Sequence, residues 1–99
     1  MLGRTIMPAV GLEEYASQTP AICNLAALYA RTGQPNDAIA ALRYGISVAP
    51  GEESLYLNLA SLYVRLDDRE AARGVIERLL AHKPNSLPAK QAWRELDIR

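Results

Sequence analysis

Two stretches of this sequence decide its fold: NLAALYAR at residues 24–31 and NLASLYVR at residues 58–65. A shift of 34 residues places residues 19–52 on residues 53–86 without gaps, and it also aligns Ala38 with Ala72 and Pro50 with Pro84. Self-similarity at a fixed period of about 20–50 residues is typical of solenoids and other repeat arrays. The chain is therefore predicted to contain two tandem units, repeat 1 (residues 19–52) and repeat 2 (residues 53–86).

Each unit has the pattern of a helix, a short turn and a second helix. In repeat 1, Thr19 can cap the first helix, and Pro20 suits its first turn. Gly33 ends that helix, and a second helix begins at residue 36 or 37 and stops before Pro50. Apolar residues at helical spacing predict the two buried stripes, namely Ile22, Leu25, Ala26, Leu28 and Tyr29, then Ala38, Ile39, Ala41, Leu42 and Ile46.

Repeat 2 follows the same plan, and a fifth helix comes after it. Acidic pairs at residues 52–53 and 67–68 lie where helices start, and there the helix dipole favours anions. Ser86 can cap the fifth helix and Pro88 suits its first turn, so residues 87–97 are predicted to cover the open end of the stack. The predicted stripes are Leu55, Tyr56, Leu59, Leu62 and Tyr63, then Ala72, Val75, Ile76, Leu79 and Leu80, and finally Ala89, Ala92, Trp93 and Leu96.

Length and composition limit the function classes. The 99 residues suffice for one small domain, and 11 Lys and Arg balance 11 Asp and Glu. Because no basic surface results, neither nucleic acid nor a membrane is an expected partner. The lone cysteine, Cys23, cannot form an internal disulfide. No signal-peptide pattern and no membrane-spanning stretch are apparent, which favours a cytoplasmic location.

Residues 1–18 lack the repeat pattern. They are expected to form an N-terminal extension that is partly disordered or a short helix. We expect any packing of this extension on repeat 1 to involve Leu12 and Tyr15.

The two units resemble tetratricopeptide repeats. That family places a large residue, a Leu, a small residue and a Tyr along its first helix, then an Ala, a bulky apolar residue and a Pro. Here those places hold Ile22, Leu25, Ala26, Tyr29, Ala38, Leu42 and Pro50 in repeat 1, and Tyr56, Leu59, Ala60, Tyr63, Ala72, Ile76 and Pro84 in repeat 2. The resemblance implies an all-α fold of about five helices, with antiparallel helix–turn–helix repeats stacked as a short right-handed α-solenoid.

The resemblance also implies a concave groove lined by the first helix of each unit. Asn can hydrogen-bond a peptide backbone and Arg can bind a carboxylate, so the expected ligand is a peptide or partner protein with an acidic group. The alternative is that these Asn residues belong to the scaffold and the Arg residues are solvated helix ends. The predicted groove residues are Cys23, Asn24, Ala27, Arg31, Leu57, Asn58, Ser61 and Arg65.

One known use of the family is disfavoured by two of these residues. Some relatives clamp a chaperone's C-terminal carboxylate with a Lys before the first Asn and a second Asn one turn later. Here Cys23 and Ala27 occupy those places, and no full third unit supplies the remaining basic pair.

No pattern in the sequence indicates an enzyme. Cys23 has no predicted cationic neighbour, and His82 is the only histidine, so no nucleophile–base pair, metal site or cofactor site is expected. The predicted function is a non-enzymatic protein-interaction scaffold. The alternative is an oligomerisation or packing segment of a larger multidomain protein, acting by self-association or by docking onto the rest of the chain.

Overall fold

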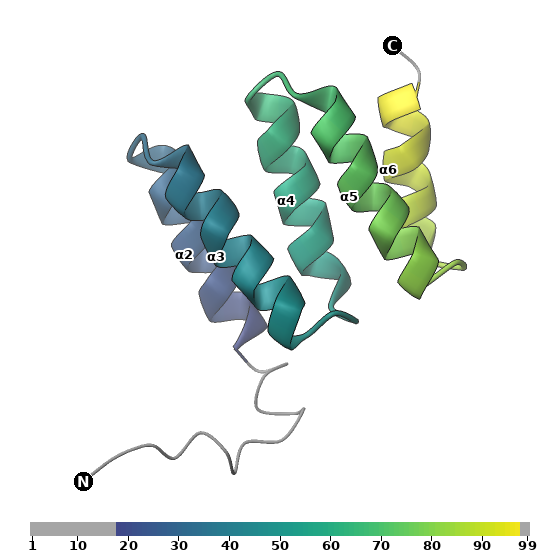
Figure 1. Ribbon diagram of the computed structural model, residues 1–99, viewed down its shortest axis with the longest axis horizontal. Helices are drawn as coiled ribbons and strands as arrows, with labels where there is room; N and C mark the ends of the chain where they lie inside the picture. The colour runs from purple at the N-terminus through teal and green to yellow at the C-terminus, as the bar shows by residue number, and fades with distance from the viewer. Residues whose placement is uncertain (1–17, 98–99) are drawn as a thin grey trace, which may run out of the picture.

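The computed structural model describes residues 18–97, and this part of the chain is all-helical (Figure 1). It contains five helices and no strand: α2 (Thr19–Arg31), α3 (Pro35–Val48), α4 (Glu53–Arg65), α5 (Arg69–His82) and α6 (Leu87–Asp97). The predicted fold class is confirmed, and α6 has the predicted bounds. The expectations for Leu12 and Tyr15 lie outside the described residues.

The helices form two layers. α2 packs on α3 and α4 on α5 as helical pairs, α6 packs on α5, and α4 also contacts α2, α3 and α6. In Figure 1, α2 lies behind α3 and α6 lies behind α5. The first helices of the successive units therefore make one layer, α2–α4–α6, and the second helices make the other.

The turn inside each unit is built in the same way. Gly33 and Asp67 occupy equivalent positions, and both have positive φ, 78° and 64°. The next residue, Gln34 or Asp68, donates its backbone N–H to the carbonyl oxygen of Tyr29 or Tyr63 at 2.8 Å in both turns. This bond closes the helix end as in a Schellman motif, which needs one left-handed residue.

Helix starts agree with the sequence in three of five cases. Asp68 Oδ1 accepts from the Ala71 N–H at 3.1 Å, Ser86 Oγ accepts from the Ala89 N–H at 3.2 Å, and α4 begins at Glu53 as predicted. The predicted Thr19 cap is wrong, because Thr19 is the first helical residue and its buried hydroxyl has no hydrogen-bond partner within the described chain. The predicted start of the second helix is also corrected, since Pro35 already stands in the first turn of α3.

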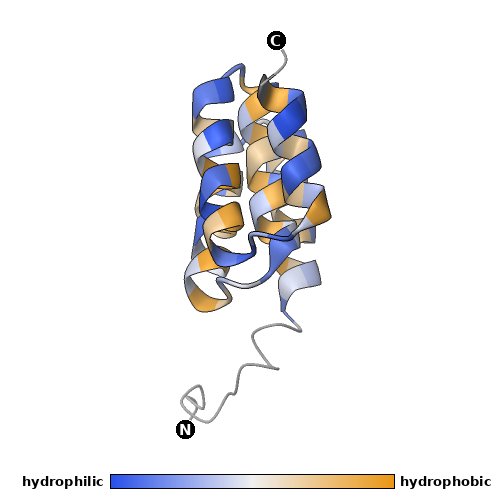
Figure 2. Ribbon diagram, turned by 90° about the vertical axis from the view of Figure 1, so that its right-hand side faces the viewer, coloured by the Kyte–Doolittle hydropathy of each residue, from blue (hydrophilic) through white to orange (hydrophobic). Residues whose placement is uncertain are grey.

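Small residues allow the helices of each unit to approach closely. The four alanines at the predicted contact positions, Ala26, Ala38, Ala60 and Ala72, are all buried. Each helix is amphipathic, with hydrophobic residues on one side and hydrophilic residues on the other (Figure 2). The aromatic stripe residue Tyr56 is fully buried.

Contacts between units use a large residue against a small one. A Cβ added to Gly45 on α3 would lie 3.0 Å from Leu55 Cδ2 on α4, so this position has no room for a larger side chain. At the equivalent positions of α5 and α6 stand Leu79 and Ala89, both fully buried. At the first contact between units the second helix supplies the small residue (Gly45) and the next first helix the large one (Leu55). At the second contact the sizes are exchanged, with Leu79 on α5 and Ala89 on α6.

The predicted burial of two leucines of α2 is wrong. Leu25 is 43% exposed and Leu28 is 47% exposed, whereas their counterparts Leu59 and Leu62 on α4 are 1% and 7% exposed. The physical reason is position in the stack. α4 is covered by α2 and α3 of the preceding unit, and no described residue precedes Gln18 to cover α2 in the same way.

Candidate functional site: the surface of α2, α4 and α6

A hollow of about 90 Å³ lies between α2 and α4, on the layer of first helices. Five of the eight predicted groove residues line it: Cys23, Ala27, Asn58, Ser61 and Arg65. Its floor is apolar and is formed by Ala26, Ala30, Leu42 and Leu62. The structure therefore brings most of the predicted set together around one depression.

A second, larger hollow of about 370 Å³ lies between α4 and α6. Leu57 and Ser61 from the predicted set line it, together with Val64, which is 36% exposed. The α6 side contributes Ala92, Glu95 and Leu96, and α5 contributes Arg69. Ser61 lines both hollows, so they adjoin across α4 and form one trough over α2, α4 and α6, called the trough below.

Asn58 is partly used by the protein itself. Its Nδ2 donates to the carbonyl oxygen of Ser54 at 2.9 Å and to Sγ of Cys23 on α2 at 3.1 Å. These two bonds occupy both amide hydrogens, so a ligand in the trough can use only the side-chain oxygen of Asn58, as an acceptor. The contact with Cys23 also links the two repeats at this level.

The predicted arginines differ in their placement. Arg65 lines the α2–α4 hollow, while Arg31 and Asn24, exposed on α2, line neither part of the trough. Within residues 18–97, neither Arg31 nor Arg65 makes a hydrogen bond or an ion pair with another side chain. Both guanidinium groups therefore retain their donors for an external carboxylate.

The contribution of α6 to the trough is absent from the sequence prediction, which treats that helix only as a cover. Arg69 helps to fix α6 in place, because its Nη2 donates to the carbonyl oxygens of Glu95 and Leu96 at 3.3 Å each.

Val64 of the trough could have been predicted from the sequence, since it follows Ser61 at helical spacing on the same side of α4.

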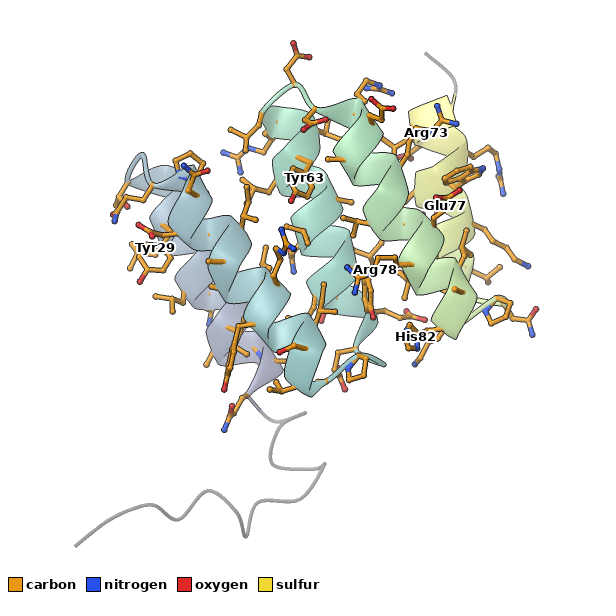
Figure 3. The ribbon with its side chains drawn as sticks, viewed as in Figure 1. Tyr29, Tyr63, Arg73, Glu77, Arg78 and His82 are labelled. Atoms are coloured by element: carbon orange, nitrogen blue, oxygen red, sulfur yellow. The ribbon has the colours of Figure 1, made fainter. Side chains whose placement is uncertain are left out.

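The opposite layer carries a separate, basic hollow between α3 and α5. Arg43, Arg78 and His82 line it, and Figure 3 shows the last two on the side of the molecule formed by these helices. At its base the Tyr56 hydroxyl donates to the Pro50 carbonyl oxygen at 2.6 Å. Burial raises the pKa of Tyr56 above its ordinary value of 10.0, and the nearby positive charge of Arg78 offsets part of that rise.

Among residues 18–97 there is no group of three His, Cys, Asp or Glu side chains arranged to hold a metal ion. No helix in this part of the chain is long and apolar enough to cross a membrane.

Comparison with known proteins adds one match. A family model described as "Tetratricopeptide repeat" matches residues 29–93, which is more than half of the chain and spans α3, α4 and α5 with parts of α2 and α6. No curated protein and no solved structure matches the chain.

Proposed function

The chain belongs to the tetratricopeptide repeat family, and from that premise we propose that it is a non-enzymatic scaffold that binds a peptide or partner protein in the trough. Repeats of this family generally mediate protein–protein interactions, and the family is typically non-catalytic. The trough is the surface on which the first helices of all successive units meet, so a single ligand there contacts every unit.

One observation carries this proposal: the two hollows share Ser61 and so offer continuous contact across α2, α4 and α6. The α4–α6 part offers apolar surface beside Arg69 and Glu95, with Leu57 half-buried and Val64 partly exposed. An apolar side chain of the ligand placed there removes this surface from water. Anchoring by a few buried apolar contacts is the usual source of affinity in such interfaces.

Charge sets the orientation of the ligand in this proposal. Arg65 lines the α2–α4 part, and Arg31 holds the equivalent position of α2, outside the lining of both hollows. Both guanidinium groups lack a partner among the described residues, so an acidic group on the ligand meets donors that the fold does not use. The proposed ligand therefore carries an apolar anchor and a carboxylate.

A peptide selected from a displayed library on the wild-type chain tests this assignment. We expect the Arg31→Ala, Arg65→Ala double variant to bind that peptide about 5- to 30-fold more weakly, because partly exposed charged hydrogen bonds are worth about 1–2 kcal/mol together. The matched control is Arg43→Ala, Arg78→Ala, which removes two exposed arginines from the opposite layer. An equal loss in both double variants, or no loss in the first, would refute the trough.

A further inference from the structure

Within residues 18–97, the N-terminal end of the stack is an apolar face that no other element covers. Leu25 and Leu28 are nearly half exposed there, although the same positions of α4 are buried by the preceding unit. In Figure 3, Tyr29 lies at the outer edge of α2, on this end of the stack. This end face therefore has the composition of an interface between repeats.

A hollow of about 380 Å³ lies on the same end and extends from α2 onto α3. Tyr44 at its rim is 57% exposed. Asp37 is the only charged residue in its lining, which otherwise consists of Ile22, Leu25, Tyr29, Ala40, Ala41 and Tyr44. A surface with so little charge favours an apolar occupant over a polar one.

The C-terminal end of the stack has a polar outer surface. The outer side of α6 carries Lys90, Gln91 and Arg94, all exposed. Terminal units of a solenoid need such a polar outer face for solubility. Although Leu87 at the start of α6 is 74% exposed, the two ends differ, because Leu25 and Leu28 at the N-terminal end hold positions that a preceding unit buries on α4.

The 34-residue register identifies a segment suited to this end. Continued upstream, it places residues 1–14 on α3 (residues 35–48), with Gly11 on Gly45 and Leu12 on Ile46. Gly45 and Ile46 are buried in α3, and Gly45 directly faces the side chain of Leu55 on α4. Residues 11–12 thus repeat, one unit earlier, the Gly–apolar pair of the last turn of α3, which is buried and in which the Gly faces the following first helix.

We propose that residues 8–17 of this chain cover the N-terminal end face, with Leu12 packed against Leu25. Pro8 suits the first turn of a short helix, and Val10 and Leu12 supply apolar side chains. The segment directly precedes α2, so its effective concentration at this face is high and no second molecule is required. This proposal concerns the end of the stack and does not depend on the trough.

Disulfide trapping tests the contact. In the full chain with Cys23→Ser, cysteines are introduced as Leu12→Cys with Leu25→Cys, and as Leu12→Cys with Asn24→Cys for the control. The two loops differ by one residue, but Asn24 lies on another side of α2 from Leu25. Because a disulfide needs Cβ atoms about 4 Å apart, we expect the first pair to close within one chain about 10-fold faster or more.

Two outcomes overturn the proposal. Equal rates in the two pairs would show that residues 8–17 do not prefer the end face. A disulfide that forms only between chains, at a rate that rises with concentration, would show that the face is covered by a second copy of the chain.

A thermal measurement covers the case in which the cysteine variants fold poorly. We expect Leu12→Gln and Leu25→Gln each to lower the unfolding midpoint by about 4 °C or more, and the double variant to lose less than the sum. Leu66, which is 42% exposed at the end of α4, gives a matched control as Leu66→Gln, with a smaller shift. Additive losses, or no shift for Leu12→Gln, would contradict the contact.

Discussion

Gly45→Ala tests how the two repeats pack on each other. Replacing glycine by alanine inside a helix stabilises it by about 0.5–1 kcal/mol when the space is free. Here the new Cβ would lie 3.0 and 3.2 Å from the two Leu55 methyl carbons and 3.3 Å from Ile22 Cδ1. Leu55 is fully buried and cannot move into solvent. Overpacking of a core costs about 1–3 kcal/mol, so we expect a net loss of about 0.5–2 kcal/mol.

Gly74→Ala is the control for this experiment. Gly74 lies inside α5, and a Cβ added there meets nothing within 4 Å, so the same substitution should gain about 0.5–1 kcal/mol. Both free energies of unfolding are measured by urea denaturation followed by circular dichroism. The difference between the variants isolates the packing cost, because the helix-propensity gain is common to both. If Gly45→Ala is as stabilising as Gly74→Ala, the proposed close contact between α3 and α4 is wrong.

Three further substitutions test local features of the fold. Thr19→Val should stabilise the chain by about 1 kcal/mol in urea denaturation, because the buried Thr19 hydroxyl lacks a partner among the described residues; a loss would reveal a hydrogen bond. Asp67→Gly should gain about 0.5–1 kcal/mol, since its φ is 64° and the equivalent residue is Gly33; an unchanged midpoint would argue against strain. The pKa of the Tyr56 hydroxyl is raised in the folded state, so as pH rises this proton is lost from the unfolded chain first. The free energy of unfolding should therefore fall as pH rises above about 10. Tyr56→Phe should reduce this alkaline loss, while costing about 1 kcal/mol at neutral pH through the lost bond to Pro50; an unchanged alkaline slope would contradict the assignment.

The fold was largely predictable because its determinants are local and repeat. The period of 34 residues, the turn residue Gly33 and the Ser86 cap each act through the backbone of the same or the next turn. Such signals can be recognised in a single sequence. The start of α6 at Leu87 followed from Ser86 and Pro88.

What the sequence could not predict depends on neighbours in the stack. Leu25 and Leu59 lie in the same sequence pattern, yet one is exposed and the other buried, because only α4 has a described unit before it. The bond from Asn58 to Cys23 joins residues 35 positions apart, and no periodicity indicates it. The α4–α6 part of the trough depends in the same way on how α6 packs beside α4.

NMR chemical-shift perturbation by a peptide selected on the wild-type chain shows where on the molecule a ligand lies. We predict that the largest shifts fall on Leu57, Ser61, Val64 and Arg65, with smaller ones on α2 and α6. The amides around Arg43, Arg78 and His82, on the opposite layer, should stay within error. Shifts concentrated on that opposite layer, or on the end face at Leu25 and Leu28, would contradict the proposed function.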